Sequence, residues 1–197
     1  MILQTRSTLR TFACSALITF SSIATAAAAV HVLDPAKSTL EFQFEQAGAQ
    51  SKGHFGKFAV ELDYSPADKA ASRMDVSIDI KSVDTGDEER DTTLRGTELF
   101  DAAKFPKAIF NAVKISSTAP GKYTAAGKLT IRGVSRDVSI PLTLTSVTEQ
   151  GKSVVKLAGK TTVKRLDFGI GQGEWKSTEW VGNDVTVSFN LRLVGTG

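Results

Sequence analysis

The chain has 197 residues, of which 41% are hydrophobic and 23% are charged, and its formal net charge is +3. This length fits a single domain, and the composition excludes intrinsic disorder, collagen-like repeats and membrane proteins with many spans. A net charge this small gives no basic stripe of the kind that nucleic-acid-binding proteins carry, so we expect no nucleic-acid partner.

The first thirty residues have the pattern of a secretory signal peptide. Arg6 and Arg10 precede an uncharged, mostly apolar run at 11–24, and small residues follow it at 24–29. A basic start, a short apolar run and an A-x-A site together predict cleavage between residues 26 and 30. We therefore expect residues 1–29 to be a signal peptide and residues 30–197 to be the exported domain. Removing the leader removes Cys14, the single cysteine, so the domain contains no disulfide and no thiolate metal site.

Alternation of apolar and polar residues is the main structural signal after residue 30. Strict alternation at 40–45, 74–81, 138–144 and 185–193 predicts strands with one dry face and one wet face. Less regular strands fit 55–64, 107–115, 123–131 and 154–163, which makes about eight. Turn residues at 65–68, 119–121, 132–133 and 149–152 separate the strands by hairpin-sized gaps. We therefore expect neighbouring strands to be mostly antiparallel.

One segment between the third and fourth strands departs from this alternation. Thr85 and Glu88 have the spacing of a capping box, and Gly96 follows Arg95, so we expect a short helix that begins at Thr85 and ends before Gly96. A second helical turn is predicted at 98–103. The segment is therefore a helical insert in an otherwise all-β chain.

Eight half-apolar strands can bury their dry faces in a sandwich or in a closed barrel, and an eight-stranded barrel can hold one small ligand. Ala125, Gly127, Ala158 and Gly159 lie within predicted strands, where small side chains would leave room in a lumen. The pattern alone leaves two alternatives open, a lumen for an apolar ligand and a closed, packed core.

Catalysis and metal binding find little support in the residues. His31 and His54 are the two histidines, and neither lies in a motif for nucleophilic or metal-dependent hydrolysis. The glycines at 169, 171 and 173 favour a flexible loop or bulge over a phosphate cradle. We therefore expect no catalytic residue, no cofactor and no metal.

The densest group of charges lies at 84–95. We expect Asp91 and Arg95 to pair one helical turn apart. A helix across a barrel mouth would also allow Arg90 or Arg95 to meet a polar ligand head, because guanidinium groups match phosphate and carboxylate. We therefore assign Arg90, Asp91 and Arg95 to the head group of a ligand.

The chain resembles the YceI family from about residue 34 to residue 193. The motifs occur in the order found in that family. They are SVDTG (82–86), RDTTLR (90–95), LFDAAKFP (99–106) with Phe110, GKLTIRGV (127–134) and RLDFG (165–169).

The resemblance implies an all-β fold, an eight-stranded antiparallel lipocalin-like barrel with a short helical insert between strands 3 and 4. It also implies a periplasmic, non-catalytic protein that sequesters or carries a long apolar lipid, above all a polyisoprenoid, with fatty acids or their amides as alternatives. Two family histidines are replaced here by Lys37 and Gln46, so a head-group role for them does not carry over. The segments 46–48 and 173–175 resemble a branch often encoded beside membrane b-type cytochromes.

That branch makes an isoprenoid quinone a plausible ligand and a membrane b-type cytochrome or another envelope complex a candidate partner, beside a second copy of the chain. We expect the inward faces of the strands to form the apolar binding site. The residues assigned to this lumen are Leu40, Phe42, Phe44, Phe58, Val76, Ile78, Ile80, Phe100, Phe110, Ile131, Ile140, Leu142, Phe168, Val187 and Phe189.

Overall fold

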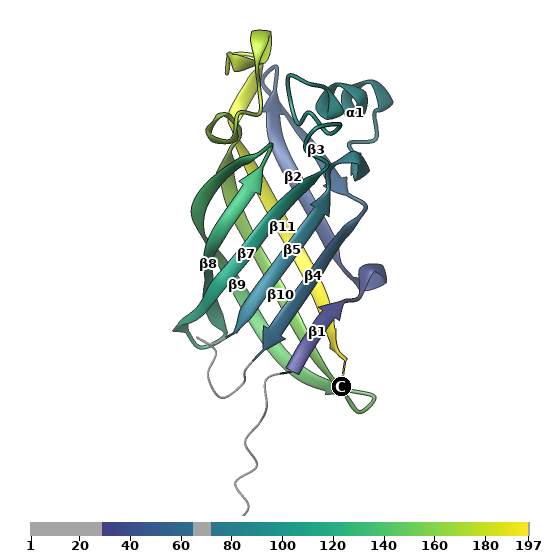
Figure 1. Ribbon diagram of the computed structural model, residues 1–197, viewed down its shortest axis with the longest axis vertical. Helices are drawn as coiled ribbons and strands as arrows, with labels where there is room; N and C mark the ends of the chain where they lie inside the picture. Colours follow the sequence, from purple (N-terminus) through teal and green to yellow (C-terminus); the bar gives the residue numbers. More distant parts are fainter. Residues whose placement is uncertain (1–28, 65–71, 197) are drawn as a thin grey trace, which may run out of the picture.

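The computed structural model describes residues 29–64 and 72–196, so residues 1–28 of the predicted signal peptide and the turn predicted at 65–68 lie outside the described residues. Within the described part, eleven strands form one antiparallel sheet that closes on itself (Figure 1). The strands are β1 (Ala29–Leu33), β2 (Thr39–Gln46), β3 (Ala49–Phe55), β4 (Phe58–Tyr64), β5 (Arg73–Asp79), β6 (Val83–Asp84), β7 (Lys107–Ala119), β8 (Lys122–Ile131), β9 (Val134–Glu149), β10 (Lys152–Lys164) and β11 (Val181–Gly195). The helices are α1 (Glu88–Arg95) and the 3₁₀ helices η1 (Pro35–Lys37), η3 (Ile80–Ser82), η4 (Arg165–Phe168) and η5 (Gly173–Lys176).

The eleven strands occupy eight positions around the barrel wall. β1 and β2 share one position because both pair with β11, β2 at residues 181–190 of that strand and β1 at residues 193–195. β3 and β4 share the next position, and β5 and β6 the one after that. The predicted eight-stranded antiparallel barrel with a helical insert is therefore confirmed, with three of its strands each broken in two. Among the described residues, no helix is long and apolar enough to cross a membrane.

The helical insert begins later than predicted. Asp87, rather than Thr85, is the N-cap residue of α1, and its carboxylate accepts a hydrogen bond from the backbone N–H of Arg90 at 3.0 Å. The helix ends at Gly96 as expected, although this glycine has an ordinary negative φ of −66°. Residues 98–103 form turns instead of a second helix. Thr85 does not cap the helix because its backbone N–H and its hydroxyl both donate to the carboxylate of Asp91.

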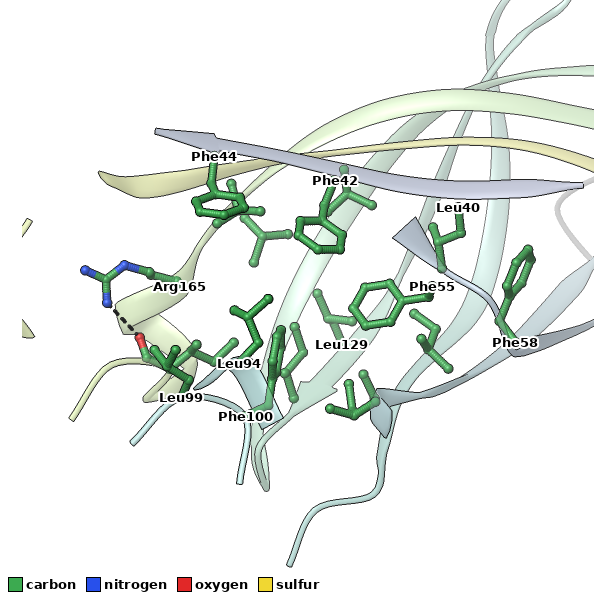
Figure 2. A pocket seen from close by; sticks show the side chains of 18 of the residues that line it. Leu40, Phe42, Phe44, Phe55, Phe58, Leu94, Leu99, Phe100, Leu129 and Arg165 are labelled. Carbon is green, nitrogen blue, oxygen red and sulfur yellow. Dashed lines mark hydrogen bonds between the residues drawn. The ribbon is translucent and has the colours of Figure 1, made fainter. Parts of the chain in front are cut away.

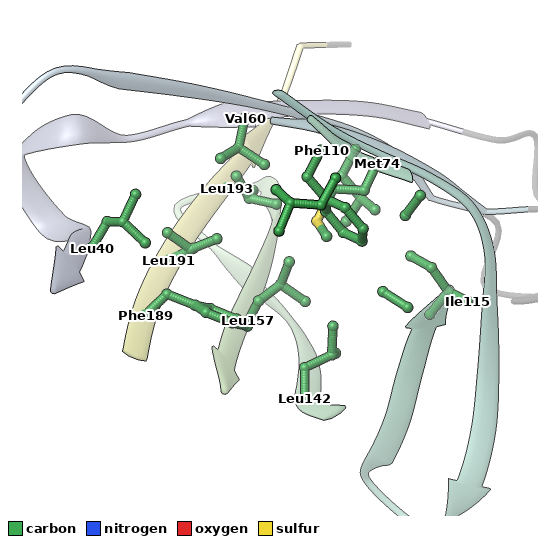
Figure 3. Packing of buried hydrophobic residues seen from close by; sticks show 14 of the residues in the cluster. Leu40, Val60, Met74, Phe110, Ile115, Leu142, Leu157, Phe189, Leu191 and Leu193 are labelled. Carbon is green, nitrogen blue, oxygen red and sulfur yellow. The ribbon is translucent and has the colours of Figure 1, made fainter. Parts of the chain in front are cut away.

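The end of the barrel that carries β1 is filled by a packed core. Leu62, Ile115, Leu157 and Leu193 are at most 1% exposed and belong to one hydrophobic cluster (Figure 3). These four side chains do not line the cavity described below, although other members of the same cluster, such as Leu40 and Phe189, do; close packing of the four stabilises this end of the barrel. The closed core that the sequence left open as an alternative is therefore present, but only in this half.

An ionic network stabilises the outer wall of the same half. Arg192 donates to Asp34 at 2.6 Å and to Glu149 at 2.8 Å, and Lys156 lies 2.7 Å from the other oxygen of Glu149. The hydrogen bond from Lys156, and then that from Arg192, lowers the pKa of Glu149 to about 2. Glu149 is therefore ionised throughout the physiological pH range.

Candidate functional site

A cavity of about 540 Å³ occupies the other half of the barrel, beneath α1. Its size lies within the usual range of small-molecule sites. Phe42 and Phe44 on β2 point into it from one wall, and Phe55 and Phe100 face them from the other side (Figure 2). The ring centroids of Phe42 and Phe55 are 5.3 Å apart, which is the spacing of a packed aromatic pair. The wall is therefore largely aromatic and aliphatic.

The cavity coincides with a split in the barrel wall. The ladder between β9 and β10 ends at the pair Leu142–Gly159, and beyond it each strand pairs only with its other neighbour. Pro141 lies at this point, where its missing N–H cannot extend the ladder. Ile140 and Thr161, one on each side of the split, both line the cavity. β9 and β10 therefore separate in the half of the barrel that contains the cavity.

The small residues proposed to create the lumen have other roles. Among the described residues that line the cavity, none is Ala125, Gly127, Ala158 or Gly159, so this expectation is wrong. Ala125 lies in the packed half, and a Cβ on Gly127 would lie 2.6 Å from the backbone of Ala112 on β7. A Cβ on Gly159 would lie 2.6 Å from the carbonyl oxygen of Pro141. At Gly127 and Gly159, close approach of backbone explains the small residue.

Thirteen of the fifteen residues assigned to the lumen line the cavity. They are Leu40, Phe42, Phe44, Phe58, Val76, Ile78, Ile80, Phe100, Phe110, Ile131, Ile140, Val187 and Phe189. The other two, Leu142 and Phe168, are buried but do not line the cavity. Leu142 is on the inner face of β9 but lies too far along the strand, and Phe168 is the last residue of η4. Contact of the thirteen with a ligand stays a prediction.

The three residues assigned to a head group have different surroundings. Arg90 lies at the mouth of the cavity beside Asp87, with 3.7 Å between the guanidinium and the carboxylate. Asp91 is buried and does not line the cavity, because its carboxylate accepts hydrogen bonds from the backbone N–H and the hydroxyl of Thr85 at 2.9 and 2.7 Å. Arg95 bonds to Glu88 at 3.0 Å, and the expected Asp91–Arg95 pair is not formed. Only Arg90 of the three lines the mouth.

A buried arginine that the sequence did not single out organises the mouth. Arg165 is 3% exposed, lines the cavity and donates all five of its N–H groups to backbone carbonyls at 2.7–3.0 Å. The acceptors belong to Ile170, Trp175, Ser177, Val181 and Gly182. Burial lowers the pKa of Arg165, but a guanidinium keeps its charge in a protein. One side chain therefore holds the whole segment 170–182, part of which is visible beside Leu99 in Figure 2.

The middle one of the three spaced glycines, Gly171, is explained by this arginine. Gly171 has a φ of +113°, and a Cβ there would lie 2.6 Å from the carbonyl oxygen of Trp175 and against the guanidinium of Arg165. Only glycine lets the backbone wrap so closely around a side chain. Gly171 is therefore required by Arg165, whereas a Cβ on Gly169 or Gly173 would lie nearest to Arg132 or Glu98.

The histidines lie away from the cavity. His31 is fully buried at the opposite end of the barrel, where its Nε2 lies 2.9 Å from the hydroxyl of Ser153. His54 is half exposed and lies 3.9 Å from Asp84. Within residues 29–64 and 72–196, no group of three His, Cys, Asp or Glu side chains could hold a metal ion. The polar residues that do line the cavity are Gln46, Asp87, Glu89, Arg90, Thr93, Thr161 and Arg165.

Comparisons with known proteins agree with this architecture. A family model described as a YceI-like domain matches residues 31–193. A UPF0312 protein of Vibrio cholerae is 31% identical over 148 residues, which cover 73% of this chain and 78% of that protein. The crystal structure of Burkholderia cenocepacia BcnA is 32% identical, with a TM-score of 0.76 over 81% of this chain and 98% of BcnA. A polyisoprenoid-binding domain from Saccharophagus degradans, implicated in plant cell wall breakdown, is 17% identical, with a TM-score of 0.68 over 85% of this chain and 99% of that domain.

Proposed function

Because this chain belongs to the YceI family, we propose that it is a binding protein that holds the chain of a polyisoprenoid or an isoprenoid quinone in the barrel. The observation that carries the proposal is the cavity wall, which is aromatic and aliphatic except for a few side chains, most of them near α1 and segment 170–182. Each 100 Å² of apolar ligand surface buried there contributes about 2.5 kcal/mol. A long prenyl chain can therefore bind tightly without a charged anchor.

The polar side chains at the mouth favour an uncharged head group. Arg165 has no free N–H for a ligand, because backbone carbonyls accept all five. The guanidinium of Arg90 lies 3.7 Å from the carboxylate of Asp87, which offsets its charge, and Glu89 adds a second carboxylate to the cavity lining. Gln46 remains as a neutral hydrogen-bonding group, and the hydroxyl of Thr93, which donates to the carbonyl oxygen of Glu89 at 2.9 Å, can still accept a hydrogen bond. This set suits a quinone or an alcohol better than a phosphate.

Binding, rather than catalysis, is supported by the same geometry. The S. degradans domain gives an example of this fold with a ligand of the proposed class. Export to the periplasm is part of the proposal and follows from the signal-peptide pattern at 1–29; the N-terminal residue of the protein recovered from the periplasm tests it. The membrane cytochrome and the homodimer stay predictions.

The decisive experiment is native mass spectrometry of protein purified without detergent, followed by addition of prenyl alcohols, isoprenoid quinones and fatty acids. We expect one prenyl lipid per chain. Ile140→Glu places a charge in the cavity wall and should abolish uptake, whereas Ser139→Glu, on the exposed face of the same strand, should not. Unchanged uptake by Ile140→Glu, or a wild-type protein that takes up no prenyl lipid, would refute the proposal.

A second pair of variants tests the cavity without a buried charge. Thr161 lines the cavity, whereas Thr162 is exposed on the other face of β10. Thr161→Phe should fill part of the cavity and weaken uptake of the longest chains first, and Thr162→Phe should leave uptake unchanged. Circular dichroism and thermal melting of each variant establish that the barrel is folded. Equal uptake by both variants would place the lipid elsewhere.

A further inference from the structure

Trp180 is the most exposed large hydrophobic side chain among the described residues, at 66% of its full accessible surface. Its chain neighbour Val181 lines the cavity, and so does Gln46, the residue that pairs with Val181 across β2 and β11. Figure 1 shows this segment at the end of the barrel that carries α1. Trp180 therefore stands at the border of the cavity mouth, where an apolar interior meets solvent.

The backbone on both sides of Trp180 is fixed. Its own carbonyl oxygen accepts a hydrogen bond from the backbone N–H of Ala47 at 2.8 Å. Arg165 holds the carbonyls of Ser177 and Val181, at 3.0 and 2.8 Å. A buried arginine and a strand tip thus hold in place a loop that presents an indole outward. The exposure of Trp180 is consequently a feature of an ordered loop.

We propose that Trp180 anchors the mouth of the cavity at the surface of a lipid bilayer, so that a prenyl chain passes between bilayer and barrel without crossing water. This inference rests on the proposed function. A lipid held in an apolar cavity leaves it readily only into another apolar phase, so the mouth of the cavity should meet a bilayer. An indole, with an apolar body and a polar N–H, is the side chain that prefers the interface of a bilayer.

The charges around the mouth identify the kind of bilayer. The segment 84–95, which includes α1, carries five carboxylates and only two arginines, and segment 174–180 carries Glu174, Lys176 and Glu179. Attraction to anionic lipids requires clusters of lysine and arginine, which these segments lack. Docking therefore depends on the indole and not on lipid charge, and it favours a zwitterionic surface.

The two tryptophans of the sequence make a selective test possible. Trp175 lines the cavity and Trp180 faces solvent, while residues 1–28 contain no tryptophan. In the full chain, Trp175→Phe leaves Trp180 as the reporter, and Trp180→Phe leaves Trp175. With phosphatidylcholine vesicles whose acyl chains are brominated, the emission of Trp180 should shift to shorter wavelength and be quenched severalfold more than that of Trp175.

Function is tested separately by lipid transfer. Trp180→Ser should slow uptake of a prenyl quinone from vesicles about tenfold, the effect expected for loss of one partly inserted aromatic side chain. Val113→Ser removes an equally exposed apolar side chain from the outer wall and should change nothing. Uptake from detergent solution, measured by native mass spectrometry, should be normal in both variants.

The outcomes distinguish the two proposals. If Trp175 responds to the quinone but Trp180 is not quenched by vesicles, the anchor is refuted, the proposed function stands, and Trp180 is assigned to a protein partner. Quenching that appears only with phosphatidylglycerol refutes docking on a neutral surface. If Trp175 is silent towards every prenyl lipid, the proposed function itself fails.

Discussion

Replacing Arg165 with lysine should release segment 170–182 from the barrel while the barrel remains closed. The guanidinium satisfies five backbone carbonyls, one in a buried and four in part-buried contacts, whereas a lysine ammonium has three N–H groups, so at least two carbonyls lose their partner. A fully buried unsatisfied acceptor costs about 1–3 kcal/mol, so two of them cost about 2–6 kcal/mol, and partial burial places the total near the lower figure. A loss of this size is a large part of the stability of one local segment.

Hydrogen exchange measured by mass spectrometry separates a local effect from a global one. The lower figure, about 2 kcal/mol, corresponds to exchange about thirtyfold faster in 170–182, while the amides of β7 and β8 should exchange as in the wild type. Arg192→Lys, at the opposite end of the barrel, should leave exchange in 170–182 unchanged. If the segment instead unfolds together with the barrel, the melting temperature should fall by at least about 4–8 °C. Exchange and melting temperature both unchanged in Arg165→Lys would refute the inference that Arg165 holds the mouth.

Three further predictions concern stability. The pKa of Glu149 is lowered to about 2 from an ordinary 4.5, so the contribution of its ionised carboxylate to stability is complete above pH 4.5 and is lost as the pH falls towards 2. The difference in melting temperature between the wild type and Glu149→Gln should therefore shrink over that range. A difference that stays constant with pH would contradict this prediction. Gly159→Ala should destabilise the barrel by about 1–3 kcal/mol in urea unfolding because its Cβ meets backbone, whereas Gly56→Ala, with nothing nearer than 3.7 Å, should be neutral. Asp91→Ala should cost about 1–3 kcal/mol because Thr85 loses its acceptor, and Asp91→Asn should retain both stability and lipid uptake, because its amide oxygen still accepts from Thr85. A loss of stability in Asp91→Asn equal to that in Asp91→Ala would contradict this role.

The strand pattern predicted the barrel because each strand has one face in water and one in the interior. It did not predict the breaks within three of the wall positions, such as that at Pro35, where η1 separates β1 from β2. β1 pairs with β4 and β11 at one end of the barrel, and β2 pairs with β3 and β11 at the other. Such a break depends on which neighbours are available at each end. The choice of neighbours is set by the tertiary structure, and it produces no periodic pattern of apolar and polar residues in the sequence.

The same alternation predicted most of the cavity wall and failed on depth. A period of two assigns a side chain to the inner or outer face but carries no information about distance along the strand. Ile140 and Leu142 are both on the inner face of β9, yet the first lines the cavity and the second packs in the core. The boundary between them is the point where β9 and β10 part, which depends on Pro141 and on pairing between strands far apart in the sequence.

Arg165 illustrates a deeper limit. The sequence methods that find an ion pair or a metal site depend on partners of particular residue types, and the partners of Arg165 are backbone carbonyls, which every residue has. The RLDFG motif at 165–169 marks the arginine without showing its role, and the spacing of the glycines at 169–173, of which Gly171 meets the guanidinium, resembles a phosphate loop just as well. A buried charge without a carboxylate is costly unless all its donors are satisfied, so five carbonyls must be presented at once. That requirement fixes the conformation of segment 170–182, and with it the position of Trp180 at the mouth of the cavity.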